Sequence, residues 1–205
     1  MKHFIIIASC SLLLLFNGCG TARIADYQPA SPSISERMAQ QSGVEVALDP
    51  FVERARTDKY FDIDAIANGI AILHVRVVNK TANQTFLVKK EGFQLLRNGA
   101  GGLTGDGKKI ERSSPAGQVM GVVGMGALMG LVGAAMVSNA TEVQRNFTSK
   151  EMGDQTLSPD ESMEGFIYFA PLNHGEDWTR AAAVKIKLAE TKTRQIIELN
   201  VPLSQ

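Results

Sequence analysis

The stretch GIAILHVRVVN, residues 69–79, decides the fold of this chain. Every second residue from Ala71 to Val77 is apolar, and the stretch is rich in β-branched side chains. Successive side chains of a strand point to opposite faces, so this period of two predicts a β-strand with one continuous apolar face. The residues that follow, NKTAN at 79–83, have the composition of a turn.

Strand patterns continue downstream of this turn. They occupy residues 85–96 around Gly92, 162–171, 182–189 and 195–203, and residues 190–193 are short enough to close a hairpin between the last two. Short strands without alternating helices favour an antiparallel sandwich. The predicted core is Leu73, Val75, Val77, Phe93, Phe166, Tyr168, Val184, Ile186, Ile197 and Leu199. Because Ile167 and Phe169 make the other face of their strand equally apolar, the pattern leaves open which face there points inward.

Two motifs carry a resemblance to a known type of module. An early strand ends in Val-Val-Asn79, and a later block reads LSPDESMEGFIYF over residues 157–169. Together they resemble the immunoglobulin-like modules of bacterial lipoproteins. The resemblance implies one mostly β, immunoglobulin-like sandwich built from residues 44–98 and 142–205. The chain lacks the Cys…Trp…Cys pattern of antibody domains, and we place its single tryptophan, Trp178, in a polar loop.

The N-terminal residues have the layout of an export signal. Lys2 precedes an uncharged, mostly apolar run over residues 4–16, which is too short to span a bilayer and has the length of a signal-peptide core. A small residue, Gly18, then precedes Cys19. This ending resembles the lipobox of bacterial lipoproteins, with Phe16 in place of the usual leucine.

The lipobox resemblance implies cleavage after Gly18, a diacylglycerol thioether on Cys19 and acylation (palmitate) of the new amino terminus. Gly20, rather than Asp, at the second mature position implies sorting to the outer membrane, facing the periplasm. A plain cleaved signal with an incidental cysteine is the alternative. We therefore expect a signal peptide at residues 1–18 and a flexible tether at 19–43, whose composition buries too little to fold.

An apolar insert interrupts the strand patterns at residues 99–141. Residues 119–137 carry no charge, and as a helix they would reach about 28 Å, close to the thickness of a hydrocarbon core. Small residues recur at spacings of four, the pattern that lets helix backbones approach closely in lipid. They are Gly117 and Gly121, and then Gly126, Gly130 and Ala134. The insert resembles the glycine-zipper segments of outer-membrane lipoproteins.

This insert leaves three interpretations open. It contacts membrane or other subunits, it folds as a helical segment or hairpin on its own sandwich, or it is a disordered apolar loop. Each interior glycine costs a helix about 1 kcal/mol relative to alanine, so a helix here needs an apolar environment or a partner. The expected partners are thus the membrane, a second copy of the chain, or another envelope protein.

No pattern in the chain predicts an enzyme. Charges balance at 21 acidic and 21 basic residues, so nucleic acid is not an expected partner. Residues 102–108 match a phosphate-loop spacing but lack its Ser or Thr, and we expect no cofactor, no metal, no catalytic residue and no small-molecule substrate. The alternative is a periplasmic enzyme or enzyme accessory that acts through the loop of His174, Glu176 and Asp177. Asp62 and Asp64 have strand spacing, which suggests two carboxylates on one face of an edge.

Overall fold

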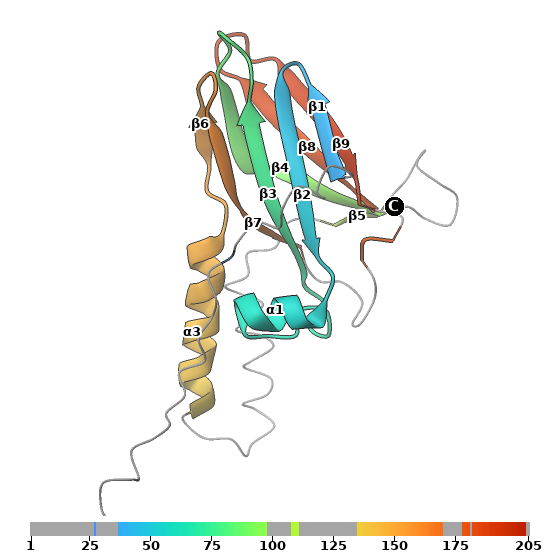
Figure 1. Ribbon diagram of the computed structural model, residues 1–205, viewed down its shortest axis with the longest axis vertical. Helices are drawn as coiled ribbons and strands as arrows, with labels where there is room; N and C mark the ends of the chain where they lie inside the picture. Colours follow the sequence, from blue (N-terminus) through green and yellow to red (C-terminus); the bar gives the residue numbers. More distant parts are fainter. Residues whose placement is uncertain are drawn as a thin grey trace, which may run out of the picture.

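The computed structural model describes Tyr27 and residues 37–97, 108–110, 135–169, 178–180 and 182–203. These residues form two antiparallel sheets packed face to face, with two helices at one end (Figure 1). The predicted class, a mostly β antiparallel sandwich, is confirmed. Its immunoglobulin-like character stays a prediction, and most of the glycine-rich insert lies outside the described residues.

The first sheet has the strand order β1-β2-β3-β7. Its strands are β1 (Met38–Gln41), β2 (Val44–Phe51), β3 (Ala71–Asn79) and β7 (Ser162–Phe169). All neighbouring pairs are antiparallel, and the strand predicted within residues 69–79 is β3, in the interior of this sheet. Because β1 pairs with β2, residues 38–41 belong to the sheet, and the prediction of a flexible tether up to residue 43 was wrong there.

The second sheet has the order β5-β4-β8-β9, with β6 also paired to β4. Its strands are β4 (Phe86–Arg97), β5 (Lys108–Ile110), β6 (Gln155–Leu157), β8 (Ala182–Glu190) and β9 (Ile196–Pro202). The predicted hairpin joins β8 to β9. The register of β4 on β8 shifts between Val88 and Phe93, where Gly92 lets the β8 backbone approach: a Cβ there would lie 2.5 Å from the Lys187 carbonyl oxygen.

A single apolar cluster fills the space between the sheets. Both sheets contribute the alternate residues of their strands, as period-two patterning requires. All ten residues predicted for the core of the sandwich are buried, and eight of them lie in this cluster. The prediction was wrong for Phe166 and Tyr168, which lie on the outer face of the first sheet. Trp178 also belongs to the cluster between the sheets and is 1% exposed. The sequence placed this residue in a polar loop and did not predict that its side chain is buried.

A second apolar cluster lies on the outer face of the first sheet, under a layer formed by α1 (Arg54–Phe61) and α3 (Ala135–Lys150), here called the helix layer. Phe166 and Tyr168 of β7 belong to this cluster, whereas Ile167 and Phe169 point into the sandwich. Both faces of β7 are therefore buried at residues 166–169, which explains why these four residues are all apolar.

Two further predictions fail where helices form. The boundary expected between insert and sandwich at residues 141 and 142 falls inside α3, which is one continuous helix. Asp62 and Asp64 do not lie on a strand: Asp62 is the left-handed C-cap of α1, and Asp64 pairs with Arg54 at 3.0 Å. Aspartate tolerates the left-handed backbone conformation that ends many helices. Asp62 therefore ends α1 here, where its spacing from Asp64 had suggested a strand.

The opposite end of the sandwich, here called the turn end, is made of turns at residues 42–43, 80–85, 158–161 and 191–194. The buried side chain of Asn79 links two of these turns, at residues 80–85 and 158–161. Its Nδ2 donates to the carbonyl oxygens of Gln84, Leu157 and Ser158 at 2.8, 3.1 and 3.0 Å. The two motifs that carried the resemblance thus meet in space.

Candidate functional site

Asp49 is the centre of a polar cluster on the outer face of the first sheet. The carboxylate lies on β2, is only 7% exposed, and accepts two hydrogen bonds from Arg56 of α1, at 3.0 Å from Nη1 and 2.7 Å from Nη2. The Tyr27 hydroxyl donates a third bond, at 2.6 Å. A bidentate guanidinium–carboxylate pair fixes the geometry of both partners. The Asp49 carboxylate is therefore held in one orientation, in which it accepts the hydrogen bond from Tyr27.

Aromatic rings surround the Tyr27 side chain. Its ring centre lies 4.4 Å from that of His74, 5.0 Å from Phe166, 5.5 Å from Phe51 and 5.6 Å from Tyr60. These distances are within the range at which aromatic pairs stabilise one another. We call these four residues, with Asp49 and Arg56, the tyrosine socket.

Charge and burial set the protonation states of the socket. Burial raises the pKa of the Asp49 carboxyl, but the hydrogen bonds from Arg56 and Tyr27 outweigh it, and the pKa lies below its ordinary value. Burial and the hydrogen bond to Asp49 raise the pKa of the Tyr27 phenol above its ordinary value. Burial lowers the pKa of His74. Near neutral pH the socket therefore holds an ionised aspartate, a protonated phenol and an uncharged imidazole.

This arrangement suits docking of a side chain better than it suits proton transfer. Both Asp49 oxygens already accept strong hydrogen bonds, and the Arg56 guanidinium stacks 4.0 Å from the centre of the Phe51 ring. A general base needs an accessible lone pair beside a substrate. What the socket does in this structure is hold Tyr27, which precedes the first strand.

The helix α3 is fixed to the same face of the sheet. Val143 and Phe147 enter the second cluster, and the Phe147 carbonyl accepts a hydrogen bond from the Tyr168 hydroxyl at 3.0 Å. The Tyr60 carbonyl accepts hydrogen bonds from Asn146 Nδ2 at 2.9 Å and Lys150 Nζ at 2.6 Å. Tyr60 also lines the socket, so α3 and Tyr27 contact the same residue of the chain.

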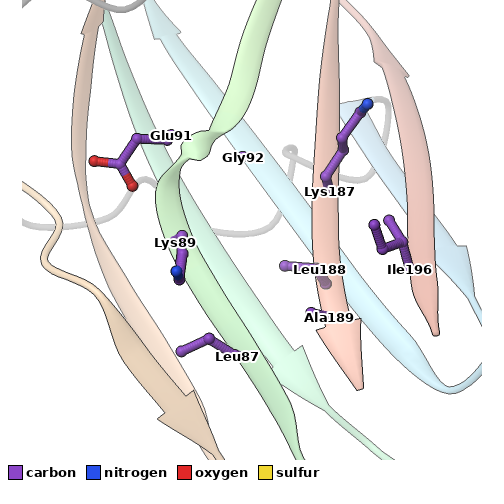
Figure 2. A pocket seen from close by; sticks show the side chains of 8 residues that line it. All are labelled: Leu87, Lys89, Glu91, Gly92, Lys187, Leu188, Ala189 and Ile196. Atoms are coloured by element: carbon purple, nitrogen blue, oxygen red, sulfur yellow. The ribbon is translucent and has the colours of Figure 1, made fainter. Parts of the chain in front are cut away.

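A separate pocket of about 310 Å³ opens on the second sheet (Figure 2). It lies along β4, β8 and the start of β9, where the bulge at Gly92 opens the sheet, and Leu87, Ile196 and Lys89 line it. Lys187 at its edge pairs with Glu198 at 3.0 Å. Its polar groups do not converge on a common point in Figure 2, so the pocket defines no ligand chemistry.

The predicted site residues lie outside the described residues. This holds for Cys19, for the small residues Gly117, Gly121, Gly126, Gly130 and Ala134, and for the loop of His174, Glu176 and Asp177. Ala134 directly precedes the first residue of α3. Among the described residues, no His, Cys, Asp and Glu side chains gather in a way that would hold a metal ion. No helix of the described part is long and apolar enough to cross a membrane.

Sequence reasoning missed the tyrosine socket. Tyr27 stands among residues whose composition predicts a tether, and Asp49 and Arg56 lie seven positions apart on two different elements. The one usable signal was His74, a polar residue inside an otherwise apolar stretch, on a face that also carries Ile72. Such a residue indicates that something covers this face, without saying what.

Comparison with known proteins adds no family. No family model matches the chain, and no curated protein matches it. Among solved structures, a Bordetella pertussis protein provisionally named ApaA aligns with 81% of this chain and 90% of its own, at 10% sequence identity and a TM-score of 0.35. At that score the likeness supports no inference about fold or function.

Proposed function

We propose that this chain is a non-enzymatic, lipid-anchored protein of the bacterial cell envelope. In this proposal Cys19 carries the lipid, the protein resides at the outer membrane and faces the periplasm, and the sandwich acts as a structural or interaction module. The glycine-rich insert then contacts the membrane or other subunits.

The observation that carries this proposal is the signal-like N-terminal run that ends in Gly18-Cys19. Tyr27, which docks on the sandwich, lies only eight residues after Cys19. Eight extended residues span at most about 28 Å. A lipid on Cys19 would therefore hold the sandwich close to the bilayer surface rather than at the end of a long tether.

The socket also supports a non-enzymatic role. Its buried charges are matched to one another, and Tyr27 occupies the space in which a substrate would have to sit. Structural ion pairs perturb pKa values as catalytic groups do, and in this pair each charge is matched by its partner.

Metabolic labelling with a fatty-acid probe tests the anchor. Wild type should incorporate the probe and sediment with outer membranes, and Cys19→Ala should lose both properties. The matched control is Cys10→Ala, which removes the other cysteine of the chain and should label like wild type. Equal labelling of Cys19→Ala and wild type would refute the anchor. Labelled wild type in inner membranes would refute the sorting alone.

A further inference from the structure

We propose that the sandwich stands end-on at the membrane, with the helix layer facing the phospholipid headgroups and the turn end pointing away. This orientation rests on the proposed lipid anchor and adds to it the face that meets the bilayer. It follows from where two segments of the chain leave the fold.

The first segment leaves at the tyrosine socket. Phe51 is the last residue of β2, and Tyr60 belongs to α1, so Tyr27 is fixed beside the helix layer and not beside the turns. The chain that leads to Cys19 therefore departs from this part of the molecule, and its length limits the distance between the socket and the lipid to about 28 Å.

The second segment leaves through α3. Lys150, at the end of this helix, contacts Tyr60, whereas its first turns extend past the sheets and away from the turn end (Figure 1). Ala135, its first residue, directly follows the row of small residues that ends at Ala134. The 16 residues of α3 are about 24 Å long, and the first residue of the helix lies at the same end of the sandwich as the tyrosine socket.

The turn end offers no comparable exit among the described residues. Its turns are joined to one another by backbone hydrogen bonds: Lys80 donates to Gly43 at 2.8 Å, and Thr191 donates to Thr85 at 2.9 Å. The central strand β3 separates the two ends by nine residues, or roughly 25–30 Å. A single connection of 28 Å would let the sandwich lie on its side. Two connections at the same end, before Tyr27 and before α3, would keep the long axis of the sandwich away from the membrane plane.

Charge does not impose this orientation. Arg54 of α1 pairs with Asp64 and Arg56 pairs with Asp49, so the charges of α1 form no basic patch for anionic lipid. We therefore expect the same orientation on uncharged phosphatidylcholine vesicles and at raised salt.

Energy transfer to a dye on lipid headgroups measures the height of each end. The lipidated full-length protein, extracted from membranes and inserted into phosphatidylcholine vesicles, receives a donor dye at a single cysteine. Ala55→Cys places it on α1 and Ala82→Cys places it in a turn, and both positions are exposed alanines. We expect clearly stronger transfer from position 55, with inferred heights that differ by roughly 25 Å. Tyr27→Ala removes the contacts that fix the N-terminal segment to the socket. When it is combined with either cysteine, the difference in energy transfer between the two positions should become smaller.

Equal transfer from the two positions, or stronger transfer from position 82, would overturn the orientation while the lipid anchor stands. An unchanged difference in the Tyr27→Ala background would overturn the role given to Tyr27. If the protein fails to float with the vesicles and mass spectrometry finds no lipid on Cys19, the proposed function fails, and the orientation fails with it.

Discussion

Gly165 shows how a single missing side chain shapes this fold. It lies on β7, where a Cβ would come within 2.9 Å of the Met152 Cα. That close approach lets Met152 donate its backbone N–H to the Phe166 carbonyl at 2.9 Å, which covers the edge of β7 just after α3 ends. An edge strand without such cover exposes unpaired backbone groups to other chains.

We predict that Gly165→Ala destabilises the fold by about 1–3 kcal/mol, because the neighbouring atom is backbone and has to move with its segment. Gly153→Ala is the matched control: nothing lies within 4 Å of its Cβ position. That change should leave stability unchanged or raise it by less than about 1 kcal/mol, since alanine restricts the unfolded chain. Urea denaturation of both variants measures the difference, and equal midpoints would contradict the packing described for Gly165.

At the level of elements, local patterns predicted the strands well and the helices poorly. The strands β3, β7, β8 and β9 alternate apolar and polar residues or are apolar on both faces, and short-range patterning suffices to find them. The short helix α1 reads RARTDKYF, with Phe61 as its one fully buried aromatic residue, so its own sequence shows little periodicity. It is stabilised by contacts that exist only after folding, such as Arg56 with Asp49.

The Asn79 side chain links the turns at residues 80–85 and 158–161, and this makes it the most sensitive polar residue of these two turns. We predict that Asn79→Ala lowers stability by about 2–4 kcal/mol, because it leaves three buried or half-buried carbonyl groups without their donor. Asn83→Ala, an exposed asparagine in the adjacent turn, should change stability by less than about 0.5 kcal/mol. Thermal unfolding of the two variants tests this prediction. Similar losses of stability in both would show that the asparagines matter as turn residues and that the hydrogen bonds of the Asn79 side chain do not.

Across the whole molecule, a buried imidazole makes the fold sensitive to mild acid. Burial lowers the pKa of His74; the charges of Glu164 and Asp49 oppose this effect, and those of Arg56 and Arg76 add to it. A group whose folded pKa is depressed binds protons more readily when unfolded. Protonation therefore favours the unfolded state, and stability falls as the pH drops below the ordinary histidine value of 6.5.

We predict that the urea midpoint of wild type decreases between pH 7 and pH 5, and that His74→Gln flattens this decrease. The comparison carries its own control, since the difference between the two slopes should vanish above pH 7.5, where the imidazole is neutral in both states. The Asp49 carboxyl, with its lowered pKa, contributes only below its ordinary value of 3.8, where its stabilising charge is lost as the pH falls further. Parallel curves from pH 7 to pH 5 would refute the role of His74.

The candidate site could not be predicted from the sequence, because its residues come from segments that are distant along the chain. The tyrosine socket joins a residue before the first strand, three strands and a helix, and no spacing rule relates Tyr27 to Asp49 or Phe166. Sequence patterns report which residues share a face of their own element. They do not report which distant segment covers that face. Here the covering residue is Tyr27, which fixes the chain before β1 to the outer face of the first sheet.

The burial of Trp178 between the sheets gives the protein an internal optical reporter. It is the only tryptophan of the chain, and the second cluster under the helix layer contains phenylalanine and tyrosine instead. Its fluorescence therefore arises inside the sandwich, at 1% exposure, and its emission should move to longer wavelength only when water enters between the two sheets. Detachment of α1 and α3 would leave that emission unchanged while the helical circular-dichroism signal falls. A single unlabelled sample can thus distinguish loosening of the helix layer from unfolding of the sheets.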